Sequence, residues 1–168
     1  MSRAFVKEGD DDGRIEQLPD RPQSPHTNYV TPNGLKSLQA RVTELSVRRA
    51  DLLQQQSLQS CQELSVVERD LRYYEERLQR AVPVGARGAA DGRVRFGDTV
   101  KVRDGAGRER RFSIVGEDEA DAPQGRISWV SPLATALLQA ESGDLVTWHR
   151  PAGDEELEIL GIAGVDGE

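Results

Sequence analysis

Apolar residues recur every three or four positions in two consecutive stretches, the pattern of two amphipathic helices. The first begins at Thr31, which can cap a helix, followed by Pro32, which suits the first helical position. The apolar faces predict a packing seam formed by Leu35, Leu38, Val42, Leu45, Arg49, Leu52 and Gln56 in one helix and by Leu64, Val67, Leu71, Tyr74, Leu78 and Ala81 in the other.

Two such faces joined by a short polar segment predict an antiparallel helical hairpin, a short coiled coil, over residues 31–82. The turn is expected within "QQQSLQSCQELS", Gln54–Ser65, and Pro83 ends the second helix. Because the seam becomes polar at Arg49 and Gln56, we expect the tip of the hairpin to fray.

From Arg93 the spacing of apolar residues changes to two, which is typical of β-strands. "RVRFGDTVKVRD" and "RERRFSIVG" flank the turn signal "DGAG", and "RISWV" is a third strand. "SPLATALLQA" predicts a short helix capped by Ser131, and a closing hairpin follows. Residues 93–168 are therefore expected to form an α+β domain, a twisted antiparallel sheet with one helix.

Two further segments show neither the helical spacing nor the strand spacing of apolar residues. Residues 1–30 contain "EGDDDG" and "LPDRPQSPHTN", with too little apolar surface to offset the entropy of ordering, and are expected to be a disordered tail. Residues 83–92 are rich in Gly and Ala and are expected to be a linker.

Composition narrows the class of protein. Hydrophobic residues make up 36% of the 168 residues and the mean hydropathy is -0.61. No apolar run approaches the roughly 20 residues of a membrane span. The beginning of the chain lacks the apolar core of a signal peptide, so a cytoplasmic protein without membrane contact is expected. The single cysteine, Cys61, excludes an internal disulfide, and with His26 and His149 it gives no zinc-ligand spacing.

The net charge of -7 is unevenly distributed, because residues 83–168 carry 16 acidic and 10 basic side chains. No segment has the basic character of a nucleic-acid-binding surface. We therefore expect any action on nucleic acid to be made through another protein. The protein is also expected to be a monomer.

Several motifs together resemble one family. "TPNGLKSLQARVTEL" resembles the T-x-x-G-x-x-x-L-x-x-E-L opening of the bacterial GreA/GreB transcript cleavage factors. "RVRFGDTVKV", "FSIVGEDEAD", "GRISWVSPLATALLQAESGDLV" and "ELEILGI" resemble, in order, the FKBP-like C-terminal half of that family. The match covers about residues 31–162, and the chain is identified as a divergent member.

The resemblance implies an accessory factor of bacterial RNA polymerase rather than an enzyme. The C-terminal domain would bind the rim of the secondary channel, and the hairpin would enter it. In such factors, acidic residues of a "G-D-x-x-E-N-A-E/D-Y" tip motif help to hold a second Mg²⁺ at the polymerase active site, where carboxylates stabilise a metal-bound water. No cofactor of its own is expected, and Mg²⁺ would be involved only indirectly.

This chain departs from the family at the tip. Glu63 is the only acidic residue from Gln54 to Val67, so it is the one weak catalytic candidate and no metal site is expected. A solvated acid near a helix start is the favoured interpretation of Glu63, and Cys61 is expected to be a bystander. The arms are about two turns shorter than in a standard cleavage factor, on the order of 10 Å of lost reach.

The candidate polymerase-binding residues lie in the C-terminal half: Val130, Ser131, Pro132, Thr135, Asp118 and Asp121. Val130 and Thr135 stand where many relatives place an acid and an arginine. "SP" could equally be only a helix cap, and "EDEAD", residues 117–121, only a solvated loop.

Three functions remain open at this point: a secondary-channel regulator without strong cleavage stimulation, a genuine cleavage factor that uses Glu63, and a prolyl isomerase. The last rests on fold analogy alone, which does not establish an activity.

Overall fold

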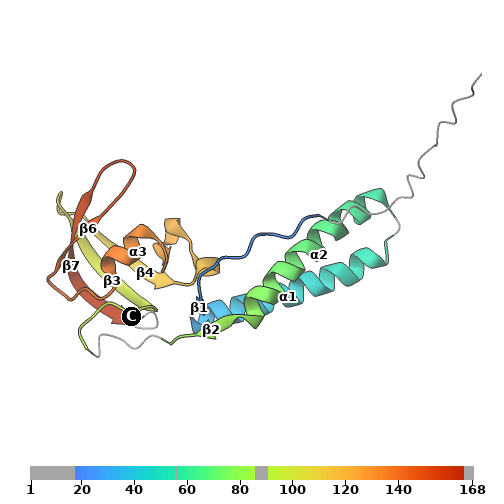
Figure 1. Cartoon of the computed structure of the whole chain (residues 1–168), viewed down its shortest axis with the longest axis horizontal. Helices are drawn as coiled ribbons and strands as arrows, with labels where there is room; N and C mark the ends of the chain where they lie inside the picture. The colour runs from blue at the N-terminus through green and yellow to red at the C-terminus, as the bar shows by residue number, and fades with distance from the viewer. Residues whose placement is uncertain (1–17, 56, 86–90, 165–168) are drawn as a thin grey trace, which may run out of the picture.

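A computed structural model describes residues 18–55, 57–85 and 91–164, which form a helical hairpin and a sheet domain (Figure 1). The expectations for residues 1–17, for Gln56 and for 86–90 within the predicted linker lie outside the described residues. The division into domains at residues 30/31, 82/83 and 92/93 stays a prediction, although two of these boundaries meet structure that the sequence did not indicate.

The hairpin consists of α1 (Pro32–Leu53) and α2 (Leu58–Gln79), as predicted. Thr31 caps α1, because its hydroxyl accepts a hydrogen bond from the Gly34 N–H at 3.0 Å. Ser57 caps α2 through a reciprocal capping box with Ser60. This serine pair starts α2 seven residues before the first predicted seam position, Leu64. The turn is therefore shorter than Gln54–Ser65 and lies between Leu53 and Leu58.

The hairpin packs along a seam that remains apolar close to the tip. Its buried residues are Leu45, Leu52, Leu64 and Val67, with Leu71 and Tyr74 packed against them. The placement of Arg49 on this seam was wrong. Leu45 and Leu52 are seven residues apart, so two helical turns connect them directly, and Arg49 projects to the side, where its Nε lies 3.0 Å from Glu68 Oε1.

A two-stranded parallel ribbon lies at the base of the hairpin. It pairs β1 (Asn28–Val30) with β2 (Ala81–Pro83), and Val30 is 1% exposed. The expectation of disorder was therefore wrong for residues 28–30, and the predicted linker begins inside a strand at Pro83. Strands of three residues are too short to show an alternating pattern, which is why the sequence did not indicate them.

The sheet domain contains five strands in the order β5-β4-β3-β7-β6. They are β3 (Asp98–Asp104), β4 (Glu109–Val115), β5 (Arg126–Ser128), β6 (Leu145–Trp148) and β7 (Glu155–Gly164). All neighbours are antiparallel except β4 and β5, which are parallel. The α+β class is confirmed, but the sheet is mixed rather than antiparallel. The chain crosses from β4 to β5 through two short 3-10 helices, η1 (Glu117–Glu119) and η2 (Ala122–Gln124), and so arrives in the same direction.

The predicted single helix of this domain is α3 (Pro132–Leu137), which lies against the curled sheet (Figure 1). It contributes Leu133, Ala134 and Leu137 to a core completed by Val94, Val100, Val102, Ile114, Leu157 and Ile159. Among the described residues, no helix is both long enough and apolar enough to cross a membrane. The core anchors the segment 115–137, which carries the six predicted polymerase-binding residues.

Candidate functional site

The tip carries Glu63 in an ion pair. Glu63 Oε1 accepts from Arg48 of α1 at 2.7 Å from Nε and 2.6 Å from Nη2. The two side chains are 43% and 45% exposed, so the pair lies in water. Within the described parts of the chain, no three His, Cys, Asp or Glu side chains gather as metal ligands would. Sequence reasoning found Glu63 but missed its partner, because the two residues meet only across the hairpin.

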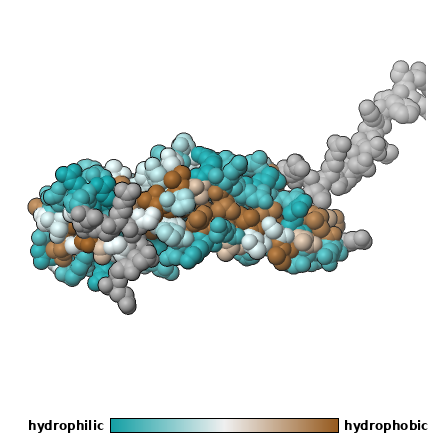
Figure 2. Space-filling view, turned by 90° about the horizontal axis from the view of Figure 1, so that it is seen from below, coloured by the Kyte–Doolittle hydropathy of each residue, from teal (hydrophilic) through white to brown (hydrophobic). Residues whose placement is uncertain are grey.

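The rest of the tip is uncharged and partly apolar. Leu58, the first residue of α2, is 87% exposed, and Leu53, the last of α1, is 56% exposed. Figure 2 shows hydrophobic residues along the face of the hairpin that is seen from below. Cys61 is half-buried and free. No residue from Gln54 to Gln62 is acidic or basic.

Four predicted docking residues lie together at the start of α3. Ser131 caps this helix, because its hydroxyl accepts from the Ala134 N–H at 3.2 Å, and its carbonyl accepts from the Thr135 hydroxyl at 3.0 Å. Pro132 and Thr135 are exposed, whereas Val130 and Ser131 are half-buried. We call residues 129–132 the docking loop. It presents a surface that a partner can reach.

The other two predicted docking residues serve contacts within the chain. Asp118 Oδ2 lies 2.6 Å from the Nε of Arg77 in α2, and Asp118 Oδ1 accepts from the Tyr73 hydroxyl at 3.1 Å. Asp121 accepts from Arg126 at 3.1 Å. The segment "EDEAD" is thus neither a freely solvated loop nor a free acidic surface. Its first part forms the junction between the sheet domain and the hairpin.

Arg77 is the centre of this junction. Its side chain is only 1% exposed, and its Nη2 lies 3.6 Å from Glu117 Oε2 in addition to the Asp118 contact. Burial, together with the nearby Asp118 carboxylate, raises the pKa of the Tyr73 phenol above its ordinary value. Tyr73 therefore remains a neutral hydrogen-bond donor over the physiological pH range.

Glu119 makes the second junction contact, at the start of α1. Its carboxylate accepts from the N–H groups of Thr31 and Gly116, each at 3.0 Å, and from the Thr31 hydroxyl. A Cβ atom at Gly34 would overlap this carboxylate, so the glycine makes room for it. Sequence reasoning missed Glu119 and Arg77. The sequence signal for the Glu119 contact was Gly34, three positions after the Thr31 cap and the only glycine in α1. Glycine is disfavoured within helices, so its presence there indicates a close neighbour.

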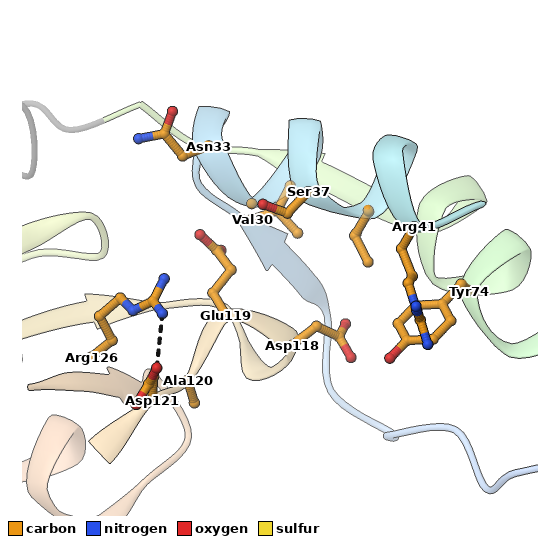
Figure 3. Close-up of a pocket in the computed structure, with 12 residues that line it drawn as sticks. Val30, Asn33, Ser37, Arg41, Tyr74, Asp118, Glu119, Ala120, Asp121 and Arg126 are labelled. Atoms are coloured by element: carbon orange, nitrogen blue, oxygen red, sulfur yellow. Dashed lines mark hydrogen bonds and ion pairs between the residues drawn. The ribbon is translucent and has the colours of Figure 1, made fainter. Parts of the chain in front are cut away.

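The junction borders a cleft of about 340 Å³ between the hairpin and the sheet domain (Figure 3). Arg41 of α1 lies beside Tyr74 of α2, with its guanidinium 5.7 Å from the ring centroid. Across the cleft lie the carboxylates of Asp118, Glu119 and Asp121 and the Arg126 side chain. These charged groups already form hydrogen bonds or ion pairs within the chain. The cleft therefore serves to connect the hairpin to the sheet domain.

A helical hairpin joined to a small α+β domain is the arrangement that the motifs predicted, and comparisons with known proteins assign it to a family. The sequence model described as "Transcription elongation factor, GreA/GreB, C-term" matches residues 89–163. The transcription elongation factor GreB of Neisseria meningitidis serogroup A is 36% identical over 152 residues, covering 80% of this chain and 93% of that protein. The chain belongs to the GreA/GreB family of transcription elongation factors.

Two further matches differ in extent. The transcription elongation factor GreA of Alkalilimnicola ehrlichii is 50% identical over 74 residues, covering 44% of this chain and 47% of that protein. A crystal structure of the GreA factor homolog 1 (Gfh1) protein of Thermus thermophilus aligns with 83% of this chain and all of that one, at 23% identity and a TM-score of 0.40.

Proposed function

We propose that this protein binds bacterial RNA polymerase through its sheet domain, places its hairpin in the secondary channel, and regulates elongation without appreciable stimulation of transcript cleavage. It acts as an accessory factor and has no catalytic residue of its own. Its contact with nucleic acid is made only through polymerase, and any Mg²⁺ involved belongs to the polymerase active site.

The state of Glu63 carries this proposal. A second Mg²⁺ at the polymerase would need carboxylate oxygens at the tip, and Glu63 is the only acid from Gln54 to Val67. Its carboxylate already accepts from two nitrogen atoms of Arg48. Of the neighbouring acids, Asp51 lies two residues before the end of α1 and Glu68 lies ten residues after the start of α2. Among the described residues, no three acidic, His or Cys side chains gather as metal ligands would.

Docking is assigned to the docking loop and the first turn of α3. Pro132 and Thr135 are exposed there, and Val130 and Ser131 are half-buried beside them. Asp118 and Asp121 are removed from the proposed contact set, because each carboxylate pairs with an arginine of this chain.

The test is a transcript cleavage assay on a backtracked complex, with binding to core polymerase measured in parallel. The wild-type protein should bind, leave the RNA near its intrinsic cleavage rate, and slow cleavage by an authentic Gre factor through competition. The variant Glu63→Gln should behave like the wild type in both assays. Strong stimulation that is lost in Glu63→Gln would overturn the proposal and make Glu63 a metal-positioning acid.

The docking surface has its own test. Ser131→Ala combined with Pro132→Ala should weaken polymerase binding while the sheet domain stays folded, because a lost cap costs only about 1 kcal/mol. The matched control is Ser142→Ala combined with Pro151→Ala, two exposed positions away from α3. Equal weakening by both pairs would contradict a docking role for the loop.

A further inference from the structure

The segment before the first helix lies along the outside of the hairpin. Residues 20–29, which we call the strap, run beside α2 and then turn toward the sheet domain (Figure 1, blue). The proposed function does not use this segment, and its composition predicted disorder.

The strap is held to α2 by several different contacts. Asp20 Oδ1 lies 2.7 Å from Arg72 Nε, and Arg21 Nη1 lies 3.5 Å from Asp70 Oδ1. The Arg21 guanidinium lies over the Tyr73 ring, 3.9 Å from its centroid. Further along, the buried Asn28 side chain donates to the Arg77 carbonyl at 2.7 Å. Ion pairs in water are individually weak, but here a cation–π contact and a buried hydrogen bond act in the same direction.

The other end of the strap packs on the sheet domain. The rings of His26 and Tyr29 meet Trp129 edge to face, with centroids 5.9 and 5.2 Å away, and Tyr29 also lies 5.8 Å from Phe96. Trp129 is the first residue of the docking loop, directly before Val130. The strap therefore touches the hairpin and supports the docking loop at the same time.

Tyr73 connects the strap to the junction. Its ring lies under Arg21, its carbonyl accepts from the Gln23 amide at 3.2 Å, and its hydroxyl donates to Asp118 at 3.1 Å. A change in the angle between the hairpin and the sheet domain would have to break contacts on both sides of this residue. Two units joined by a short connection can otherwise rotate relative to each other as rigid bodies. The contacts of Tyr73 oppose such a rotation.

We propose that the strap fixes the angle between the hairpin and the sheet domain, with Arg21 and His26 as its positioning residues. The strap thereby sets the position of the tip when the docking loop binds RNA polymerase. This second statement rests on the proposed function.

A distance measurement in the free protein tests the strap. Nitroxide labels are attached at Leu58→Cys on the tip and at Thr147→Cys on β6, in a chain that also carries Cys61→Ser. Double electron–electron resonance should give one narrow distance distribution. The strap variant, Arg21→Gln with His26→Ala, should give a broader or shifted distribution at unchanged helix content.

The matched control is Lys36→Gln with His149→Ala, which removes one cationic side chain and one histidine at exposed positions outside the strap. It should leave the distribution narrow. The conservative pair Arg21→Lys with His26→Phe, which keeps a cation over Tyr73 and a ring against Trp129, should restore it. A wild-type distribution in the strap variant, or equal broadening in the control, would overturn the proposal.

A polymerase-binding measurement distinguishes the role of the strap in fixing the angle from its role in docking. The strap variant should bind core polymerase roughly threefold to tenfold more weakly than the wild type, as expected for the loss of a few exposed contacts. Unchanged affinity and unchanged competition with a Gre factor, despite a broadened distribution, would overturn the role of the strap in docking. If the wild type does not bind at all, the proposed function fails, and the distance measurement still decides whether the strap fixes the angle.

Discussion

The two ends of the hairpin differ in how they use charge. At the base, Arg77 is buried and its Nε lies 2.6 Å from the Asp118 carboxylate, while Glu119 accepts from two backbone N–H groups. Near the tip, Glu63 pairs with Arg48 in water, and Leu58 faces solvent. The acidic residues of the sheet domain hold the base of the hairpin in place, whereas the residues from Gln54 to Gln62 include no acidic or basic side chain.

The two ends show that the placement of acidic residues matters more here than their number. The chain carries 29 acidic residues, yet only Glu63 falls within the fourteen residues from Gln54 to Val67. Counting acids would therefore suggest metal chemistry that their placement does not support. Each of the following variants changes one end of the hairpin.

The largest effect is expected from Arg77→Ala. It would leave Asp118 and Glu117 without their buried partner, and breaking a buried pair on one side costs about 3–5 kcal/mol. The control, Arg80→Ala, removes a 39% exposed arginine one turn further along the chain, which should cost less than about 1 kcal/mol. Urea unfolding followed by circular dichroism measures both. Similar losses for the two variants would mean that Arg77 is not the centre of the junction.

Leu52→Ala examines the seam near the tip. Leu52 is 2% exposed, so truncation should cost roughly 2–4 kcal/mol of the free energy of unfolding. The adjacent Leu53 is 56% exposed, and Leu53→Ala should cost well under half of that. If both variants unfolded at the same urea concentration, the seam would not extend to the tip, and fraying there would be the better description.

Gly34→Ala addresses the space reserved for Glu119. The added methyl group would displace a carboxylate that satisfies two N–H groups, and each donor left unsatisfied costs about 1–3 kcal/mol. Alanine is favoured over glycine in a helix by about 1 kcal/mol, so a net loss of at least about 1 kcal/mol is expected. Gly105→Ala has open space around it and should be nearly neutral. A stabilised Gly34→Ala variant would show that Glu119 moves aside without cost.

The smallest effect is expected from Arg48→Gln, which frees Glu63. An exposed ion pair of this kind contributes about 0.2–1 kcal/mol. Thermal unfolding at low and high salt measures this directly, because screening should remove the difference between the variant and the wild type. A larger, salt-independent loss would indicate that the tip pair is structural in the way that the Arg77 pair is.

The sequence predicted the elements whose signals are local. Helical spacing, the Thr31 and Ser131 caps and the alternation in β3 and β4 each lie within a few residues, and the hairpin and the α+β class followed from them. Features that depend on distant partners could not be predicted. The parallel pairing of Tyr29 with Val82, the ion pair of Arg77 with Asp118 and the contact of His26 with Trp129 each join residues from separate elements.

The Glu119 contact also has a consequence for the order in which the molecule is made. The carboxylate that completes the start of α1 lies 88 residues after Thr31. Ribosomes add roughly 5–20 residues per second, so on the order of ten seconds separate the synthesis of the two. During that interval the Glu119 carboxylate is not yet available to the first turn of α1. The contact that joins the start of α1 to η1 can therefore form only after the chain has been made through Glu119.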